Sequence, residues 1–458
     1  MTALTLAQKL KTHSSAVAML RNSQIGPYAF PVVKHEFTNW RDEQRSWRET
    51  CALFDQSHHM SDLYISGPDT LRLLADLGVN SFRNFTVNKG KQFVACNYDG
   101  YVIGDAILFF LEPDAVSLVG RPPALNWTRF HAETGDYDVT VERDERSAVN
   151  DGRRRVYRYQ VQGPNALAVM EKATGKAVPQ VAFFNMDEFR IGGCRVRALR
   201  HGMVGMPGFE LFGPWDDGER VKDALVAAGD EFGLRQVGAR TYPTSTLESG
   251  WIPSPLPAVY SGADMQAYRD WLPADGYEAM ASLGGSFESD AIEDYYLTPF
   301  DLGYGGFVRF DHDFIGRAAL EALADRQSRQ KVTLAWNGED LVQTLGSMFL
   351  QPAGGRAKYL DLPLANYATL PFDRIMAGGE VVGLSMYTGY SSNEGTVLSL
   401  SVIDKGWAEP GTEVTVVWGE SSGGTSKPTV ETHRQTELRA TVGPAPFADL
   451  ARTDYRSK

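Results

Sequence analysis

The sequence has few of the features that mark secreted or membrane proteins. Its 458 residues include only three cysteines, Cys51, Cys96 and Cys194, which lie too far apart to form a CxxC pair. The longest apolar run, AILFFL at 106–111, is much shorter than the roughly 18 residues that span a bilayer. Residues 1–20 lack the continuous apolar core of a signal peptide and predict a short amphipathic helix. We therefore expect a cytoplasmic protein with reduced thiols and no membrane segment.

The sequence also has fewer positively charged than negatively charged residues. The chain carries 45 Lys and Arg against 57 Asp and Glu, a formal net charge of −12. Such a balance argues against a general affinity for nucleic acid or for anionic lipid, because both present negative phosphates. We therefore expect a small-molecule partner, bound in a locally favourable pocket.

Several familiar catalytic and metal-binding signatures are missing. His58 and His59 are adjacent, so their side chains diverge in extended backbone, and no HExxH motif is present, which predicts no metal site. The segment GESSGGTSK at 419–427 lacks the GK[ST] ending of a phosphate loop and is typical of a hairpin loop. DLGYGGFV at 301–308 is not a dinucleotide motif, and GYSSN at 389–393 lacks the second glycine of a nucleophile elbow. A triad hydrolase and a nucleotide-binding enzyme are thereby disfavoured.

Strand and helix patterns alternate without the regular order of a doubly wound sheet, which predicts an α+β fold. After a helix at 316–327 the composition becomes β-rich, which predicts a catalytic region of two interlocked α+β subdomains over 1–330 and a β-barrel or sandwich domain over 331–458. The stretch 256–290 has weak periodicity and is interpreted as a long insertion packed over the core. Strands are expected at 62–67, 102–111, 115–120, 156–163, 194–202, 332–336, 378–387, 396–404 and 413–419, and helices at 68–78, 163–175 and 219–233.

A series of ordered motifs carries a family resemblance. The motifs are LFDQSHHM (53–60), NYDGYVIGDAILFFL (97–111), HGMVGMPGFELFGP (201–214), VGARTYPTSTLESGW (237–251) and LTPFDLGYGGFVRFDHDFIGRAALE (297–321). Together they resemble the glycine-cleavage aminomethyltransferase family and its folate-dependent demethylase relatives. The resemblance implies a three-domain cloverleaf around a central folate channel, which agrees with the α+β interpretation and the β-rich C-terminal part.

One departure from the family pattern narrows the expected activity. Where aminomethyltransferases carry paired aspartates, this chain has Gly104 followed by Asp105, so a lipoyl-protein partner is not expected. The residues in several motifs are instead similar to those of tetrahydrofolate-dependent O-demethylases of methoxylated aromatic acids. This resemblance implies transfer of a methyl group from syringate, or otherwise vanillate or 3-O-methylgallate, to tetrahydrofolate. A demethylase of a sulfur or amine donor and a folate-binding protein without turnover are the alternatives.

An aryl methyl ether needs a proton donor beside its oxygen, because the leaving group is a phenoxide. Tyr242 is the predicted donor, since a phenol with an ordinary pKa near 10 matches the phenol being released. Its position before Pro243 also fits a simple extended-loop aromatic residue. His59 is the second catalytic candidate, with a packed, hydrogen-bonded imidazole as its alternative.

The remaining candidates are binding residues for the aromatic acid. Arg121 precedes Pro122 and offers a rigid fork of donors for a carboxylate, although a surface ion pair or a contact to the folate tail fits the same residue. Tyr28 and Gln56 are expected in the aromatic pocket. Phe30 joins them, because an apolar ring there leaves no hydroxyl to satisfy beside a second methoxy group.

The family resemblance assigns three further residues to the folate. Glu210 would accept the paired N–H donors of a pterin, although strand alternation alone also permits a solvent-facing position. Trp251 would stack on the folate unless it is a core residue. Gln162 is the third residue expected at the cofactor.

Overall fold

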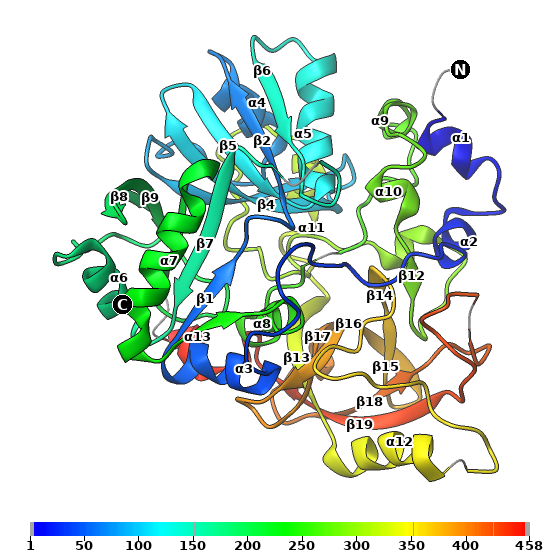
Figure 1. Cartoon of the computed structure of the whole chain (residues 1–458). Helices are drawn as coiled ribbons and strands as arrows, with labels where there is room; N and C mark the ends of the chain where they lie inside the picture. The colour runs from blue at the N-terminus through cyan, green and yellow to red at the C-terminus, as the bar shows by residue number, and fades with distance from the viewer. Residues whose placement is uncertain (1–3, 151–152, 254, 351, 425, 454–458) are drawn as a thin grey trace.

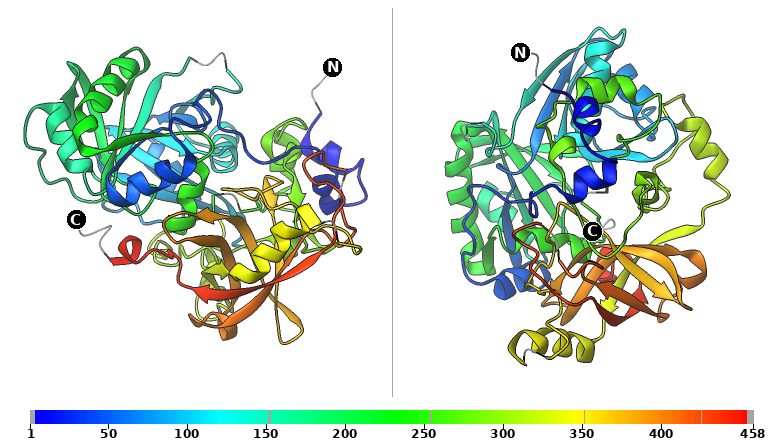
Figure 2. Two further views of the ribbon diagram at one scale, coloured as in Figure 1. Left: turned by 60° about the horizontal axis from the view of Figure 1, so that its bottom comes forward. Right: turned by 90° about the vertical axis from the view of Figure 1, so that its right-hand side faces the viewer.

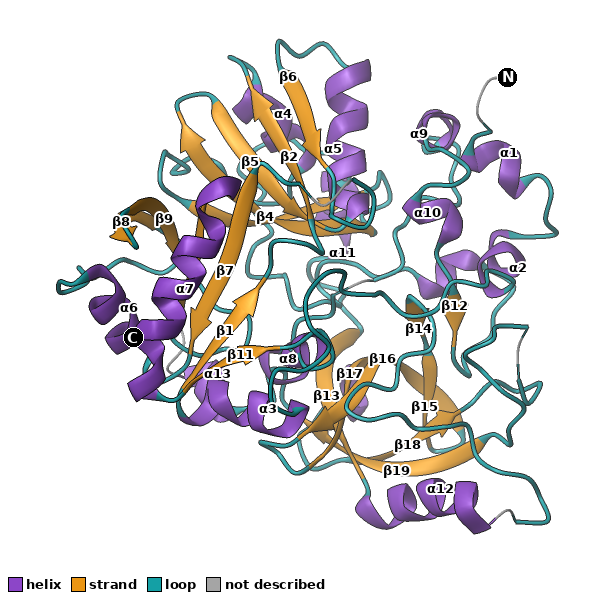
Figure 3. Cartoon of the chain, viewed as in Figure 1, coloured by secondary structure: helices purple, strands orange, loops and turns teal. Residues whose placement is uncertain are grey.

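The computed structural model describes residues 4–150, 153–253, 255–350, 352–424 and 426–453. Two mixed α/β layers stand beside a closed β-barrel, and helices cover the outer faces of the sheets (Figure 1, Figure 3). This arrangement confirms the predicted α+β class and identifies the β-rich C-terminal part as a barrel. Within these described ranges, no helix is long and apolar enough to cross a membrane.

The first sheet has the strand order β11-β1-β7-β10-β9-β8. Its strands are β1 (Cys51–Asp55), β7 (Val156–Gln162), β8 (Met186–Ile191), β9 (Cys194–Arg200), β10 (Gly208–Pro214) and β11 (Leu234–Val237). Helices α6 (Ala166–Thr174) and α7 (Gly218–Gly229) pack together on one face and share its apolar core. Helix α3 (Trp40–Glu49) packs against β1 and β11. The predicted strands at 156–163 and 194–202 are confirmed, and so are the predicted helices at 163–175 and 219–233.

The second sheet has the order β3-β4-β5-β2-β6 and is antiparallel throughout. Its strands are β2 (Ser61–Ser66), β3 (Gly90–Cys96), β4 (Val102–Glu112), β5 (Ala115–Gly120) and β6 (Thr140–Asp144). Helices α4 (Thr70–Leu77) and α5 (Pro122–Thr134) cover it. Helix α5 starts on two prolines, which suit the first turn because its N–H groups have no partner inside the helix.

The chain passes from the first sheet to the second and back, and this path creates the site. Strand β1 is followed directly by β2 in the other sheet, and the chain returns through β7, which pairs with β1. The turn at 56–60 therefore lies where the two sheets meet. Gln56 is tied there by its N–H, which donates to the carbonyl oxygen of Arg158 at 2.9 Å.

The barrel closes in the order β13-β17-β16-β15-β18-β19. Its strands are β13 (Arg329–Trp336), β15 (Asp373–Ala377), β16 (Glu380–Ser391), β17 (Thr396–Asp404), β18 (Glu413–Trp418) and β19 (Thr436–Gly443), with α12 (Gly338–Leu350) outside. Strands β18 and β19 pair antiparallel and are joined by residues 419–435, so the predicted hairpin loop at 419–427 is the first part of a longer connection, of which Thr425 lies outside the described residues. The division of the chain at residue 330 remains a proposal.

The segment 256–290 packs over the core, as expected from its composition. It contains α9 (Gln266–Trp271), α10 (Tyr277–Met280) and β12 (Leu283–Gly284), which pairs with β14 (Leu370–Pro371). Tyr260 and Tyr268 from this segment join the same apolar core as the second sheet and two barrel strands. Helix α8 (Ser245–Ser249) precedes the segment, and α11 (Arg317–Leu323) and α13 (Asp449–Thr453) complete the main helices.

The single amphipathic helix predicted over residues 1–20 is wrong. The structure has two short helices, α1 (Leu6–Leu10) and α2 (Ala16–Arg21), and residues 1–3 lie outside the described ranges. The hydroxyl of Ser15 accepts a hydrogen bond from the N–H of Ala18, which starts a second helix where the first has ended. Helix α1 packs against α9 and α10, with the N–H of Leu6 donating to the carbonyl of Leu272, and α2 packs against β12 (Figure 1, Figure 2).

Candidate active site

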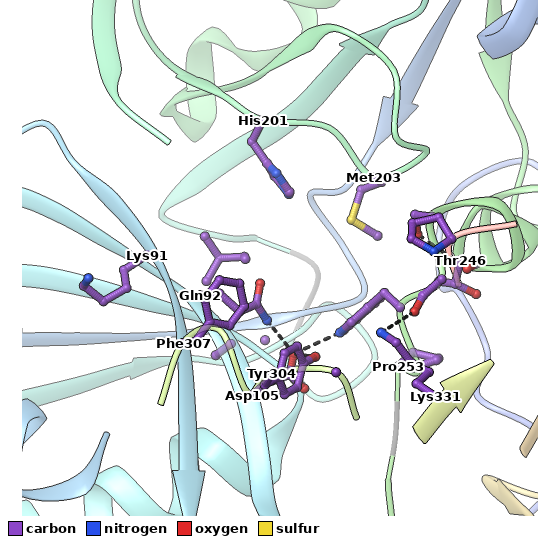
Figure 4. Close-up of a pocket in the computed structure, with 18 of the residues that line it drawn as sticks. Lys91, Gln92, Asp105, His201, Met203, Thr246, Pro253, Tyr304, Phe307 and Lys331 are labelled. Atoms are coloured by element: carbon purple, nitrogen blue, oxygen red, sulfur yellow. Dashed lines mark hydrogen bonds between the residues drawn. The ribbon is translucent and has the colours of Figure 1, made fainter. Parts of the chain in front are cut away.

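A cavity of about 900 Å³ lies where the two sheets, the loop after β11 and the barrel come together. Figure 4 shows part of its wall. Its volume falls within the range of ligand pockets in enzymes, which extends to about 1,000 Å³. Most of the predicted site residues line it, namely Phe30, Gln56, His59, Arg121, Glu210, Tyr242 and Trp251. Residues that are distant in the sequence thus meet in one cavity.

Tyr242 lies at the centre of an aromatic group on the cavity wall. Its ring centroid is 4.8 Å from that of Phe30, 4.7 Å from that of His59 and 5.5 Å from that of Phe54. The Nε2 of Gln56 donates a hydrogen bond to the Tyr242 hydroxyl at 3.1 Å. Burial raises the pKa of Tyr242 well above its ordinary value of 10.0, so the expected pKa match with the leaving phenol does not hold in this structure. Tyr242 is therefore a neutral hydrogen-bond donor at working pH.

Gln56 and His59 are buried beside Tyr242 and carry no charge. The Oε1 of Gln56 has no hydrogen-bond partner among the residues that the structure describes, although a buried acceptor is normally satisfied. Burial lowers the pKa of His59 to about 3, and the positive charge of Arg121 adds to this effect. His59 is thus a neutral imidazole, and the Gln56 oxygen is available to a donor on a ligand.

Arg121 lines the cavity and contacts Tyr28 at one end of it. The guanidinium carbon of Arg121 lies 4.4 Å from the centroid of the Tyr28 ring, a cation–π contact. Tyr28 lines a small adjoining cavity rather than the main one, and its hydroxyl donates to the carbonyl oxygen of His59. Phe30 lines both cavities. Arg121 therefore faces the interior, which removes the surface ion pair as an explanation for it.

Glu210 faces the interior between the two sheets. Its Oε1 accepts a hydrogen bond from Arg158 at 3.2 Å, and Arg158 also pairs with Asp62 at 2.5 Å. Burial raises the pKa of Glu210, while Arg158 opposes the rise. The solvent-facing alternative for Glu210 is wrong, because the second sheet covers this face of β10 and leaves the residue only 4% exposed.

Gln162 lies behind the cavity wall, next to the lining residue Gly202. It is not among the described residues that line the wall, and its amide is engaged with the backbone of the loop 201–207. Its Nε2 donates to the carbonyl of Met206 at 2.8 Å, and its Oε1 accepts from the N–H of Val204 at 2.8 Å. A Cβ on Gly202 would lie 1.3 Å from this Nε2. Gln162 therefore supports a loop whose Met203 lines the cavity, and a place for Gln162 at the cofactor stays a prediction.

Asp105 was not among the predicted site residues, yet it is a central feature of the cavity wall. Its Oδ2 accepts hydrogen bonds from Gln92 at 2.5 Å, from Tyr304 at 2.9 Å and from the indole N–H of Trp251 at 2.9 Å (Figure 4). Burial raises the pKa of Asp105, whereas these hydrogen bonds lower it. Asp105 lies in VIGDAIL, one of the segments that carry the family resemblance, so this motif could have identified it as a site residue. Trp251 uses its only donor on Asp105, and its ring lines the cavity.

Gly104 explains why no second carboxylate precedes Asp105. A Cβ at this position would lie 3.0 Å from the backbone nitrogen of Ala124 and 3.3 Å from the Cβ of Pro123. Helix α5 packs this closely on β4, so an aspartate would force the helix away.

Among the described residues that line the cavity, positive side chains outnumber negative ones. Asp105 and Glu210 are its acids, and the lining cations are Lys91, Arg121, Arg309, Arg329, Lys331 and Lys405. Lys331 donates to the carbonyl of Gly250 at 2.7 Å, and burial lowers its pKa to about 8. Lys331 had no signal in the sequence, because it lies in an ordinary strand. In a chain with a net charge of −12, this lining favours an anionic ligand.

Comparison with known protein families agrees with the motif series. The sequence model described as the GCVT N-terminal domain matches residues 10–254. The chain belongs to the GCVT family. A syringate O-demethylase of Sphingobium sp. strain SYK-6 is 50% identical over 454 residues, which are 99% of this chain and 98% of that protein. A sesamin methylene transferase of Sinomonas sp. strain No.22 is 31% identical over 93% of this chain and 92% of that protein.

A solved structure of the same family confirms the predicted fold type. The glycine cleavage system aminomethyltransferase T of Bartonella henselae superposes with a TM-score of 0.61 at 18% identity, covering 94% of this chain and 95% of that one. The GCVT protein described here therefore shares the aminomethyltransferase fold over nearly its whole length.

Proposed function

We propose that this GCVT protein is a tetrahydrofolate-dependent O-demethylase of methoxylated aromatic acids. The methyl group of syringate, or otherwise of vanillate or 3-O-methylgallate, goes to tetrahydrofolate and yields the phenol and 5-methyltetrahydrofolate. The observation that carries the proposal is the 50% identity with a syringate O-demethylase, which extends over 99% of the chain. The cavity chemistry supports it independently.

The cavity residues fit a reduced folate. Glu210 and the unpartnered Oε1 of Gln56 are buried acceptors, which suit the N–H donors of a pterin ring. Trp251 provides an aromatic face, and the cations Lys91 and Arg309 suit the carboxylates of the folate tail. When bound there, tetrahydrofolate supplies the nitrogen that accepts the methyl group.

Tyr242, oriented by Gln56, acts on the ether oxygen. The net reaction breaks the methyl–oxygen bond, forms a methyl–nitrogen bond and exchanges the methyl group for a proton. Because the amide of Gln56 donates to the Tyr242 oxygen, the Tyr242 proton is directed elsewhere, and Tyr242 donates it to the departing oxygen in a hydrogen bond. The raised pKa keeps Tyr242 neutral, so it stabilises the developing phenoxide and remains a donor.

Arg121 and Phe30 set the substrate class. The Arg121 guanidinium pairs with the carboxylate of the aromatic acid, a contact that contributes about 1.5–3 kcal/mol. The Phe30 ring, packed against Tyr242, presents an apolar surface that suits a second methoxy group. Syringate, which carries two methoxy groups, is therefore the first substrate to test.

Methylene transfer is a second candidate function. It is favoured by the 31% identity with a sesamin methylene transferase over 93% of the chain. A substrate with a methylenedioxy ring would in that case release both oxygens of the ring as hydroxyls. Competition between such a compound and syringate separates the two functions.

We further propose a cytoplasmic location and no lipoyl-protein partner. The three cysteines are buried free thiols, as a reducing compartment permits. The packing of α5 against Gly104 leaves no room for the second aspartate of the aminomethyltransferase pattern.

The test is an anaerobic incubation of the purified protein with tetrahydrofolate and each methoxylated acid. We expect 5-methyltetrahydrofolate and the demethylated acid in equal amounts, fastest with syringate. Arg121→Ala should lose roughly tenfold or more in preference for acids over neutral methoxyphenols. Arg195→Ala, a change at a 71% exposed side chain, is the matched control. Absence of product with every donor would reject the proposed function.

A further inference from the structure

Tyr277 contacts Arg121 from behind the cavity wall. Tyr277 begins α10, in the segment 256–290, and its hydroxyl oxygen accepts a hydrogen bond from the Arg121 guanidinium. Of the described residues, those that line the two cavities beside Arg121 do not include Tyr277. Tyr277 is therefore placed to act on a ligand through Arg121.

Helix α10 is fixed to the helix that follows Arg121. The carboxylate of Glu278 is buried, and its two oxygens accept from the amide of Asn126 at 2.9 and 3.1 Å. Asn126 belongs to α5, and Arg121 is the residue directly before the first turn of that helix. The hydroxyl of Tyr260 also donates to the backbone oxygen of Glu278 at 2.8 Å. The backbone of Tyr277 is therefore held at a defined position relative to Arg121.

Arg121 is enclosed by phenol groups. Tyr28 stacks on one face of the guanidinium at 4.4 Å, and Tyr277 and Tyr387 also interact with it. Burial opposes the charge of Arg121, but its pKa is not lowered overall, and an arginine guanidinium stays charged at neutral pH. A neutral phenol orients an arginine without cancelling its charge, whereas a carboxylate partner would compete with an anionic ligand.

We propose that Tyr277 is a positioning residue that holds the Arg121 guanidinium toward the cavity for the carboxylate of the aromatic acid. This inference rests on the proposed function and assigns part of its acid specificity to the segment 256–290. Arginine has large rotamer freedom, and a guanidinium held in place before binding loses less of it on meeting the ligand. Removal of the Tyr277 hydroxyl should weaken the binding of acids and leave the methyl-transfer step unaffected.

The test compares Tyr277→Phe with the wild type on two donors. One is syringate, and the other is the dimethoxyphenol that lacks only its carboxylate. We expect KM for syringate to rise roughly tenfold with kcat changed less than about twofold, and kcat/KM for the dimethoxyphenol to stay the same. Tyr268→Phe is the matched control, because Tyr268 is a buried tyrosine of the same segment whose hydroxyl has no hydrogen-bond partner among the described residues.

The possible results separate this inference from the proposed function. Unchanged kinetics of Tyr277→Phe on syringate, or an equal loss on both donors, would overturn the positioning role while leaving O-demethylation intact. A wild-type protein that turns over neither donor with tetrahydrofolate would reject the proposed function and this inference together. Because KM does not depend on the amount of folded enzyme, the comparison remains valid if the variant is less stable.

Discussion

Glu210→Gln tests the folate-binding assignment most directly. The change keeps the shape of the side chain and removes one negative charge. A hydrogen bond to a charged acceptor contributes about 1.5–3 kcal/mol, against about 0.5–1.5 kcal/mol for a neutral one. If two N–H donors of the pterin meet this carboxylate, the loss is about 2 kcal/mol, and the Kd for tetrahydrofolate should rise roughly thirtyfold.

The surrounding ion pairs indicate that the variant will fold. Arg158 loses the Glu210 contact at 3.2 Å but keeps Asp62 at 2.5 Å, so no buried charge is left alone. Its neighbour Arg154 pairs with Asp62 and Asp144 as before. We therefore expect a change of no more than about 1 kcal/mol in the free energy of unfolding.

The assay is tetrahydrofolate binding by calorimetry under anaerobic conditions, repeated at several pH values. Because burial raises the pKa of Glu210, the wild-type affinity should fall as the pH is lowered through that raised pKa, whereas the variant should lack this dependence. Glu420→Gln is the control, since it also neutralises a buried, ion-paired glutamate, beside Lys358. A Kd for Glu210→Gln within about twofold of the wild type would refute the reasoning, and so would an equal loss in Glu420→Gln.

Three further predictions follow from the site. Tyr242→Phe should lower kcat by about a hundredfold or more and leave the Kd for tetrahydrofolate unchanged. Tyr157→Phe is the control and should change neither quantity, because the buried Tyr157 hydroxyl has no hydrogen-bond partner among the described residues. Normal turnover of Tyr242→Phe would exclude a donor role. The pKa of His59 is lowered to about 3 in the folded protein, so the free energy of unfolding should fall as the pH drops below 6.5. Chemical denaturation near pH 5 should show that His59→Gln removes about 2 kcal/mol of this loss. Gly202→Ala should lower the free energy of unfolding by about 1–3 kcal/mol, because the new methyl group displaces the Gln162 amide. In a double-mutant cycle with Gln162→Ala the two effects should not add, and simple additivity would contradict the contact.

Local sequence patterns determined the elements of the fold. Apolar alternation and helix-ending glycines predicted strands such as β2, β4, β7 and β17 and helices such as α4 and α6, because backbone geometry repeats every two or about 3.6 residues. The motif series predicted the family, and with it the cavity positions of Tyr242, Glu210 and Arg121. The break between α1 and α2 was missed, since a serine cap competes with an amphipathic pattern over the same residues.

Only the tertiary structure decided what each candidate side chain contacts. Gln162 and Gln56 are equally polar in the sequence, yet the first is occupied by a loop backbone and the second leaves an unpartnered oxygen beside the cavity. Lys331 and Tyr277 belong to unremarkable segments. Lys331 lines the cavity and Tyr277 contacts Arg121 because the barrel and the insertion fold back onto the two sheets. Contacts between residues far apart in the chain depend on packing, and burial by that packing also sets the pKa of Tyr242 and His59. Neither effect has a local sequence signal.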